Sequence, residues 1–144
     1  MQLPQPPFVS FIRRHHVLTL ATVGPDGPHC SNMFYAYVTD RNLFVFTSEH
    51  HTIHARQALE NPVAAASIVL ETRVVGRVRG LQLRGRVRPV QDEEGLRKAY
   101  LKRFPYAAVV ELYLWVFEPA WMKLTDNTLG FGKKLIWNDE QNQL

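Results

Sequence analysis

The chain has 144 residues, of which 46% are hydrophobic and 21% charged, with a formal net charge of +4. This composition suits one folded domain over residues 1–144, excludes an intrinsically disordered chain and is compatible with an anionic ligand. A single cysteine excludes an internal disulfide framework and a cysteine-rich zinc site. No apolar run reaches the roughly 18 residues of a membrane span, and the first residues do not form a secretory signal, so we expect a cytoplasmic protein.

Turn residues and hydrophobic spacing predict the elements in chain order. A short amphipathic helix is expected over residues 7–16. Alternation and β-branched residues predict about six strands, the last of which, or a strand pair, is broken by Pro119. The strands are expected over residues 17–24, 28–39, 43–48, 63–70, 78–90 and 113–127. Two further helices are predicted over residues 52–61 and 91–105, and Pro62 ends the first of them.

Short strands joined by tight turns, with few helices, predict a mainly β fold. The turns at residues 24–27 and 40–42 connect neighbouring strands as hairpins. A small antiparallel barrel would remove the exposed edges that an open meander carries. An open sheet with helices packed on one side is the alternative that this pattern leaves.

Three histidines within five residues, His50, His51 and His54, raise the question of a metal site. His50 and His54 have the i, i+4 spacing that places two side chains on one helix face. A catalytic zinc needs a third protein ligand, and no HExxH or similar motif supplies one. We therefore expect no metal, and we expect His50 and His51 to lie in a surface loop.

The same segment also fits an anion site at the start of a helix. A strand ends near Thr47 and Ser48, and a helix begins near Thr52, whose first amides lack intrahelical partners. Hydroxyls of these three residues can donate to phosphate oxygens, and a protonated His54 can add charge. An equally simple interpretation is that Thr52 is only a helix cap.

The order of segments resembles the pyridoxamine 5′-phosphate oxidase-like FMN-binding split-barrel family. The resemblance rests on "VLTLATVGPDGPHCSNMFYAYVTDRNLFVFTSEHHTIHARQALENPVAAASIVL", followed by "VRGLQLRGRVRPV". The segments "KRFP" and "TDNTLGFGKKLIW" are similar to the YhbP-type branch and extend the resemblance almost from end to end. The family implies a six-stranded antiparallel split β-barrel that forms a homodimer, with two FMN sites at the subunit interface.

The resemblance also implies which positions hold the cofactor. The strand that includes Asn32, Met33, Phe34 and Tyr35 corresponds to the one lying along the isoalloxazine and ribityl chain. Phe46 and Thr47 correspond to the point where the next strand meets the ribityl phosphate, with Ser48 beside them. Thr52, Ile53 and His54 fall where the family commonly carries Ser, Arg and Lys around the phosphate. Gln82 lies near the position of a flavin-contacting Gln.

The chain departs from the family pattern at the phosphate positions. Ile53 cannot pair with phosphate, and His54 is a weaker cation than Lys at neutral pH. The Arg and His that true oxidases use on pyridoxal phosphate have no clear counterpart, so oxidation of pyridoxamine phosphate is not expected.

The tail "DNTLGFGKK" offers a second group of candidate residues. Phe131 could stack on an aromatic ring, and Lys133 could meet a phosphate. Gly130 and Gly132 permit positive φ or close backbone approach. The alternative is a surface arm that packs on the partner subunit.

A basic stripe follows one face of the strand at 78–90, through Arg84, Arg86 and Arg88. Without a nucleic-acid-binding motif, we interpret it as a solvated strand face rather than a nucleic-acid site. Cys30 is expected to take a small, buried, apolar role.

These observations predict an FMN-binding flavoprotein, with FMN-dependent oxidoreductase activity as the expected chemistry. The sequence names neither its substrate nor its catalytic residues. The alternative is a non-enzymatic split barrel that has lost FMN or that binds haem or another anionic ligand.

Overall fold

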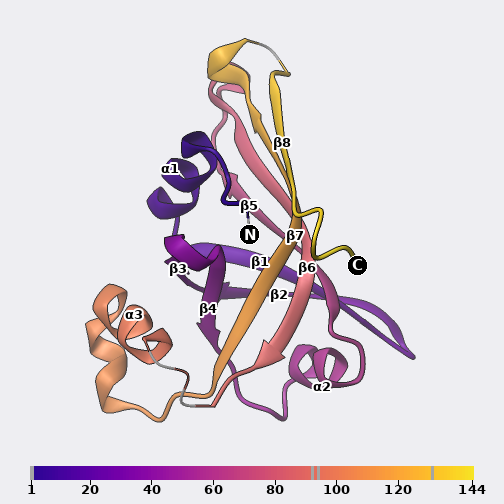
Figure 1. Cartoon of the computed structure of the whole chain (residues 1–144), viewed down its shortest axis with the longest axis vertical. Coiled ribbons are helices and arrows are strands. Elements are labelled where there is room, and N and C mark those ends of the chain that lie inside the picture. Colours follow the sequence, from indigo (N-terminus) through magenta and orange to yellow (C-terminus); the bar gives the residue numbers. More distant parts are fainter. Residues whose placement is uncertain (1, 92, 94, 131) are drawn as a thin grey trace.

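The chain folds into one antiparallel sheet of eight strands that curls into a half-barrel, with three α-helices around it (Figure 1). The computed structural model describes residues 2–91, 93, 95–130 and 132–144. The strands are β1 Val17–Gly24, β2 Gly27–Phe34, β3 Ala36–Val38, β4 Leu43–Thr47, β5 Val63–Leu70, β6 Arg79–Pro89, β7 Leu114–Asp126 and β8 Lys134–Asn138. The helices are α1 Pro6–Arg14, α2 Ile53–Glu60 and α3 Leu96–Arg103, and 3-10 turns lie at Thr39–Arg41, Val75–Arg77, Pro105–Val109 and Asn127–Leu129.

The strand order explains why the barrel is split. The order is β2-β1-β5-β6-β7-β4-β3, with β8 paired to β7. β2 and β3 lie at opposite ends of this order, yet only Tyr35 separates them in the chain. The Tyr35 amide donates to the His16 carbonyl at 3.0 Å, and its buried hydroxyl donates to the Ile12 carbonyl at 2.6 Å. Tyr35 therefore brings the two ends of the sheet together without adding a ladder between them.

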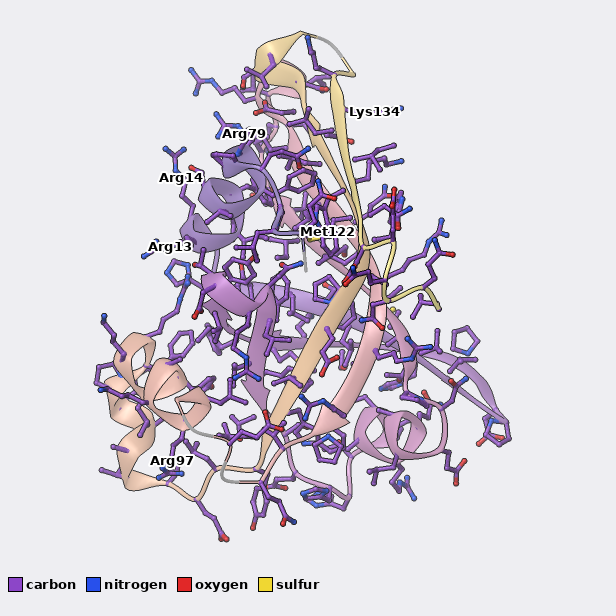
Figure 2. All side chains as sticks on the ribbon, in the orientation of Figure 1. Arg13, Arg14, Arg79, Arg97, Met122 and Lys134 are labelled. Carbon is purple, nitrogen blue, oxygen red and sulfur yellow. The ribbon has the colours of Figure 1, made fainter. Side chains whose placement is uncertain are left out.

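The main core fills the inner face of this half-barrel. Helix α1 contributes Phe8, Phe11 and Ile12, whose spacing places them on one helix face. The inward-facing residues of the strands, which are every second residue, pack in the same core, for example Leu18 on β1 and Met122 on β7. In Figure 2, Met122 lies in the interior, whereas Arg13, Arg14, Arg97 and Lys134 lie at the periphery.

A second, smaller core lies on the opposite face of the sheet under α3. Leu96, Tyr100 and Phe104 of the α3 region pack against Val45 of β4 and Val116 of β7. In consequence β4 and the first part of β7 are buried on both faces, as their burial patterns show.

The predicted fold class and hairpins are confirmed, with corrections in detail. Strand β2 does not run on to residue 39, because Tyr35 turns into the core and the chain restarts as β3. The tail is not only an arm, because it forms β8, a partner of β7. With these two changes the sheet has eight strands, where about six were expected.

The predicted break at Pro119 is wrong. β7 runs through Pro119 as one strand, and the ladder with β6 instead shifts register between Arg84 and Gly85. This irregularity accommodates a residue that cannot donate to the ladder. The backbones approach so closely that a Cβ built on Gly85 would lie 2.1 Å from the Glu118 carbonyl oxygen, so only glycine fits.

No helix among the described residues is long and apolar enough to cross a membrane.

Candidate functional site

The loop after β4 is anchored to the start of β7 by backbone and side-chain hydrogen bonds. The Tyr113 amide donates to the Thr47 hydroxyl at 3.0 Å, and the Ser48 amide donates to the Tyr113 carbonyl at 2.9 Å. The indole N–H of Trp115, which is buried in the main core, donates to the Ser48 carbonyl at 2.9 Å. The hydroxyl of Ser48 is thus held at a fixed place beside the split in the barrel.

Helix α2 begins at the same place with a well-formed cap. Thr52 is the N-cap, and its hydroxyl accepts from the Ala55 amide at 3.3 Å and donates to the Glu49 carbonyl at 2.9 Å. The amides of Ile53 and His54, the first two helical residues, have no carbonyl to reach within the helix. They direct the positive end of the helix dipole at the space in front of Thr52.

His54 joins the two hydroxyls into one cluster. Its Nε2 lies 2.5 Å from the Ser48 hydroxyl and 3.3 Å from the Thr52 hydroxyl. Burial lowers the pKa of His54 below its ordinary value, and the nearby charge of His29 lowers this pKa further. The ring is therefore neutral at neutral pH, with Ser48 as its hydrogen-bond partner.

His29 lies near enough to His54 for its charge to act on that ring, and it belongs to the β1–β2 hairpin, which α2 holds in place. Gln57 of α2 accepts from the Thr22 hydroxyl at 2.7 Å and donates to the Gly27 carbonyl at 3.3 Å. A Cβ on Gly24 would lie 2.9 Å from the Gln57 side chain, which shows how closely helix and hairpin pack. We call the group formed by His29, Ser48, Thr52 and His54 the His54 corner.

The site residue that sequence reasoning missed is His29. Strand alternation contained the signal, because Met33, Ser31 and His29 share one face of β2 and Met33 is a core residue. Ser31 adds a further feature, since its hydroxyl oxygen is buried and has no hydrogen-bond partner within the described part of the chain. A buried polar atom of this kind calls for an explanation, such as a ligand or water that completes it.

The other predicted cofactor residues divide into two groups. Met33, Tyr35 and Phe46 point into the main core, so a ligand could reach only their backbone. Asn32, Phe34 and Gln82 lie on the opposite side of the sheet and are exposed.

The strand register shows how far these exposed residues lie from one another. Asn32 faces Thr19 across the ladder and accepts its hydroxyl hydrogen bond at 2.7 Å. Gln82 lies in the same row, across Ser67, and is three strands from β2, or roughly 14 Å at the usual strand spacing. Phe34 packs against Phe104 with ring centroids 5.5 Å apart. Within a single chain, Gln82 and Asn32 are therefore too far apart to contact the same small part of a cofactor.

The predicted tail residues lie away from the His54 corner. Lys133 is exposed in the turn before β8, at the far end of the β7–β8 pair (Figure 1). Phe131 lies outside the described residues.

Much of the sheet face opposite the main core has no cover from the described residues. On β2, β1 and β5 this outward face carries mainly small or apolar side chains that are wholly or partly exposed, and on the middle of β6 it carries Gln82 and Arg84. They include Val17, Ala21, Phe34, Ala65, Ser67 and Val69. Cys30 is also exposed here, so the expectation of a buried role is wrong.

The basic stripe is largely engaged in contacts within the chain. Arg88 pairs with Glu118 at 2.5 Å and with Glu93 at 2.6 Å. Arg79 pairs with Asp126 at 3.5 Å. Arg84 stacks on Trp121, with its guanidinium 4.7 Å from the ring centroid. These contacts neutralise or cover most of the stripe, which favours the solvated strand face.

Within the described ranges, no three His, Cys, Asp or Glu side chains are grouped so that they could hold a metal ion. His50 packs against Tyr113 and Trp115, with ring centroids 5.6 Å and 5.3 Å away, and His51 pairs with Glu49 at 3.2 Å on the surface.

Comparisons with known proteins agree with this architecture. The family model described as pyridoxamine 5′-phosphate oxidase matches residues 5–125. A UPF0306 protein of Photorhabdus laumondii is 37% identical over 129 residues, covering 88% of this chain and 90% of the relative. The UPF0306 protein YhbP of Escherichia coli O157:H7 is 34% identical over 129 residues, covering 88% of each.

Solved structures share the fold at low sequence identity. A pyridoxamine 5′-phosphate oxidase-related, FMN-binding protein of Nostoc punctiforme superposes with a TM-score of 0.70 at 11% identity, covering 99% of this chain and 94% of the other. A heme binding protein of Mycobacterium smegmatis superposes with a TM-score of 0.72 at 20% identity, covering 88% and 54%. The match over residues 5–125 and the relatives above 30% identity together establish that this chain belongs to the pyridoxamine 5′-phosphate oxidase family of split barrels, in its UPF0306 (YhbP) branch.

Proposed function

We propose that this chain is an FMN-binding flavoprotein that works as a homodimer, with the FMN phosphate held at the His54 corner. One observation carries the proposal: hydroxyls, the His54 imidazole and free helix amides gather at the start of α2, with His29 of β2 nearby. Membership of a family with an FMN-binding structural neighbour supports the choice of FMN as the anion.

The donor set of the His54 corner fits a phosphate monoester. The amides of Ile53 and His54 provide N–H donors at a helix N-terminus, which favour a negative charge. Ser48 adds a hydroxyl, and the buried hydroxyl of Ser31 lies on the same face of β2 as His29. Thr47 can donate as well, because accepting the Tyr113 amide leaves its own proton available, whereas the Thr52 hydroxyl already donates to the Glu49 carbonyl.

The edge and outward face of β2 suit the rest of the cofactor. β2 is the last strand in the sheet order, so only one of its edges is paired. The ribityl chain and ring would lie along the free edge, within reach of Asn32 and Phe34. Exposed small and apolar side chains on the outward face provide the surface on which a second copy would pack and enclose the ring.

When bound, FMN would supply hydride and electron transfer through its ring. The protein residues bind the phosphate, orient the ring against β2 and exclude water at the interface between copies. The proposal assigns no substrate, because the described site residues do not include an Arg and His pair suited to pyridoxal phosphate.

The test is a titration of purified, cofactor-free protein with FMN, followed by absorbance and by quenching of flavin fluorescence. The proposal expects saturable binding at one FMN per chain, and binding of riboflavin that is weaker because the phosphate is missing. Ser48→Ala should weaken FMN but leave riboflavin unchanged, because only the phosphate contact is lost. The exposed Ser10→Ala on α1 is the matched control and should change neither.

Equal affinity for FMN and riboflavin would place the phosphate elsewhere. A protein that stays colourless in excess FMN would overturn FMN binding, and a Soret band after haem addition would then favour the haem-binding alternative.

A further inference from the structure

The His54 corner offers imidazoles, rather than a lysine or an arginine, as the cations that could contact a phosphate. The members of the corner that can carry positive charge are the imidazoles of His29 and His54. Arg56, one turn along α2, is exposed and lines a hollow of about 430 Å³ together with His29 and Gln57. Because the pKa of His54 is lowered, its imidazole is neutral at neutral pH, where a Lys or Arg at the same position would be charged.

The charged groups near His54 come from several elements of the described chain, including Glu111, which acts on Tyr113 just before β7. On the loop before α2, Glu49 is paired with His51 on the surface, and His50 faces Tyr113 and Trp115. From the β1–β2 hairpin come Asp26 in the turn and His29 on β2, and from α2 itself come Arg56 and Glu60. His29 is the neighbour whose charge acts on His54. A bound phosphate would therefore be the largest negative charge that the two imidazoles meet.

We propose that anion binding at this corner is coupled to protonation: the phosphate of FMN binds together with one proton, taken from solvent onto His54, with His29 as the second imidazole facing the anion. This inference rests on the proposed function and adds to it the regulation of the site by pH. The affinity for FMN should therefore fall as the pH rises through neutrality.

The hydrogen bond between Ser48 and His54 gives the coupling a mechanism. When the neutral ring carries its proton on Nδ1, Nε2 accepts the Ser48 proton across the 2.5 Å contact, and the hydroxyl has no proton left for a ligand. When His54 is protonated, Nε2–H donates to the Ser48 oxygen instead. The Ser48 O–H is then free to donate to a phosphate oxygen, so that one proton adds both a charge and a donor.

The sign of the effect follows from the pKa of His54 in the free protein. Burial and the charge of His29 lower this pKa, so His54 is mostly neutral at neutral pH in the free protein. A phosphate dianion beside the ring raises the pKa in the complex. Between the two pKa values binding takes up a proton, and by linkage the dissociation constant rises up to about tenfold per pH unit.

The experiment measures the FMN dissociation constant from pH 6 to pH 8 in the wild type and in His54→Lys. The wild type should lose affinity steeply as the pH rises, whereas the permanently charged lysine should bind with nearly constant affinity. The ionisation of the FMN phosphate itself, near pH 6, is common to both proteins and cancels in the comparison. Calorimetry in two buffers of different ionisation enthalpy should report uptake of about one proton by the wild type and less by the variant.

Two further ligands and variants keep the outcomes separate. Riboflavin, which lacks the phosphate, should bind with no such pH dependence. His54→Gln keeps a hydrogen-bonding side chain without titrating and should bind FMN weakly at every pH, which provides the test if the lysine variant does not fold. FMN binding with the same pH slope in wild type and variants would overturn the coupling while leaving the proposed function intact. An absence of FMN binding at every pH would overturn both.

Discussion

The outward face of the sheet differs sharply between its two halves. Over β4 and the start of β7, α3 covers this face with Leu96, Tyr100 and Phe104, and the strands are buried on both sides. Over β1, β2 and β5 the described residues leave the same face uncovered, so that the inward side chains of β1 and β5 are mostly buried and the outward ones are partly or fully exposed. Because all these strands share one inner core, the difference comes from the outward side alone.

This comparison shows which part of the sheet is complete within one chain. The α3 half buries its apolar side chains within the chain, so it can serve as the rigid support for the loop that carries Ser48. In the uncovered half, Phe34 is 50% exposed and Val69 is 63% exposed. Several exposed apolar side chains on one face indicate an interaction surface, whereas single scattered ones do not. A second copy of the chain is the cover that we propose for it.

The largest effect is expected from truncating a residue in the half that is buried on both sides. Phe44 is fully buried, and its ring lies 5.3 Å from that of Tyr35 and 5.0 Å from that of Tyr37. Phe44→Ala should lower the free energy of unfolding by about 3–5 kcal/mol, because it leaves a cavity. Denaturant titration measures this, with Val69→Ala on the uncovered half as the control. Similar losses for both variants would mean that Val69 is packed as tightly as Phe44 of the main core.

A charge in the middle of the uncovered half should abolish self-association. Ser67 is exposed, between Thr19 and Gln82 in the ladder. In a homodimer, Ser67→Glu would bury an unpaired carboxylate, at a cost of about 3–5 kcal/mol of association free energy. Sedimentation velocity should show dimers of the wild type and monomers of the variant, with Ser10→Glu on α1 as the control. A variant that stays dimeric would place the interface on another surface.

A smaller effect is expected at the start of α2. Thr52→Ala removes the side chain that accepts from the Ala55 amide, so the free energy of unfolding should fall by about 1 kcal/mol. Thr52→Ser keeps the oxygen and should restore most of this stability in thermal or chemical unfolding. An alanine variant as stable as the wild type would mean that the Thr52 cap does not stabilise the protein. Unchanged affinity of that variant for FMN would mean that other donors hold the phosphate.

The smallest effect is expected on the α3 side, from the ion pairs of Glu93. Arg88 lowers the pKa of Glu93 through a hydrogen bond and its charge, with help from Arg41. A carboxylate with a lowered pKa adds stability above its unfolded pKa, and this stability is lost as the pH falls through the folded pKa.

Glu93→Gln should therefore cost less than about 1 kcal/mol at pH 7, since solvent screens an exposed pair. The difference from the wild type should vanish in acid, as measured by unfolding at a series of pH values. A difference that persists in acid would mean that packing, rather than charge, explains the loss.

Much of the fold could be predicted because its signals are local. Alternation set the bounds of β1 and β5, and the capping residue Thr52 with Pro62 set those of α2. The continuity of β7 could not be predicted in this way, because the partner strand absorbs Pro119 through its register shift at Gly85. The division at Tyr35 also depends on a distant contact, the bond of its hydroxyl to Ile12.

The candidate site was predicted in part, for the same reason. Ser48, Thr52 and His54 lie within seven residues of one another, so the loop and helix that bring them together are local features. His29 is 25 positions before His54 and reaches it only because Gln57 holds the hairpin against α2. Residue spacing contains no information about that approach.

By itself the sequence determined most of the strands, the helix cap and the family, because each depends on side-chain type and order along a short stretch. Only the tertiary structure decided which strand face was left uncovered and which histidine met His54. Those outcomes depend on how α2 and α3 pack on a curled sheet, and packing is settled by contacts between segments far apart in the chain.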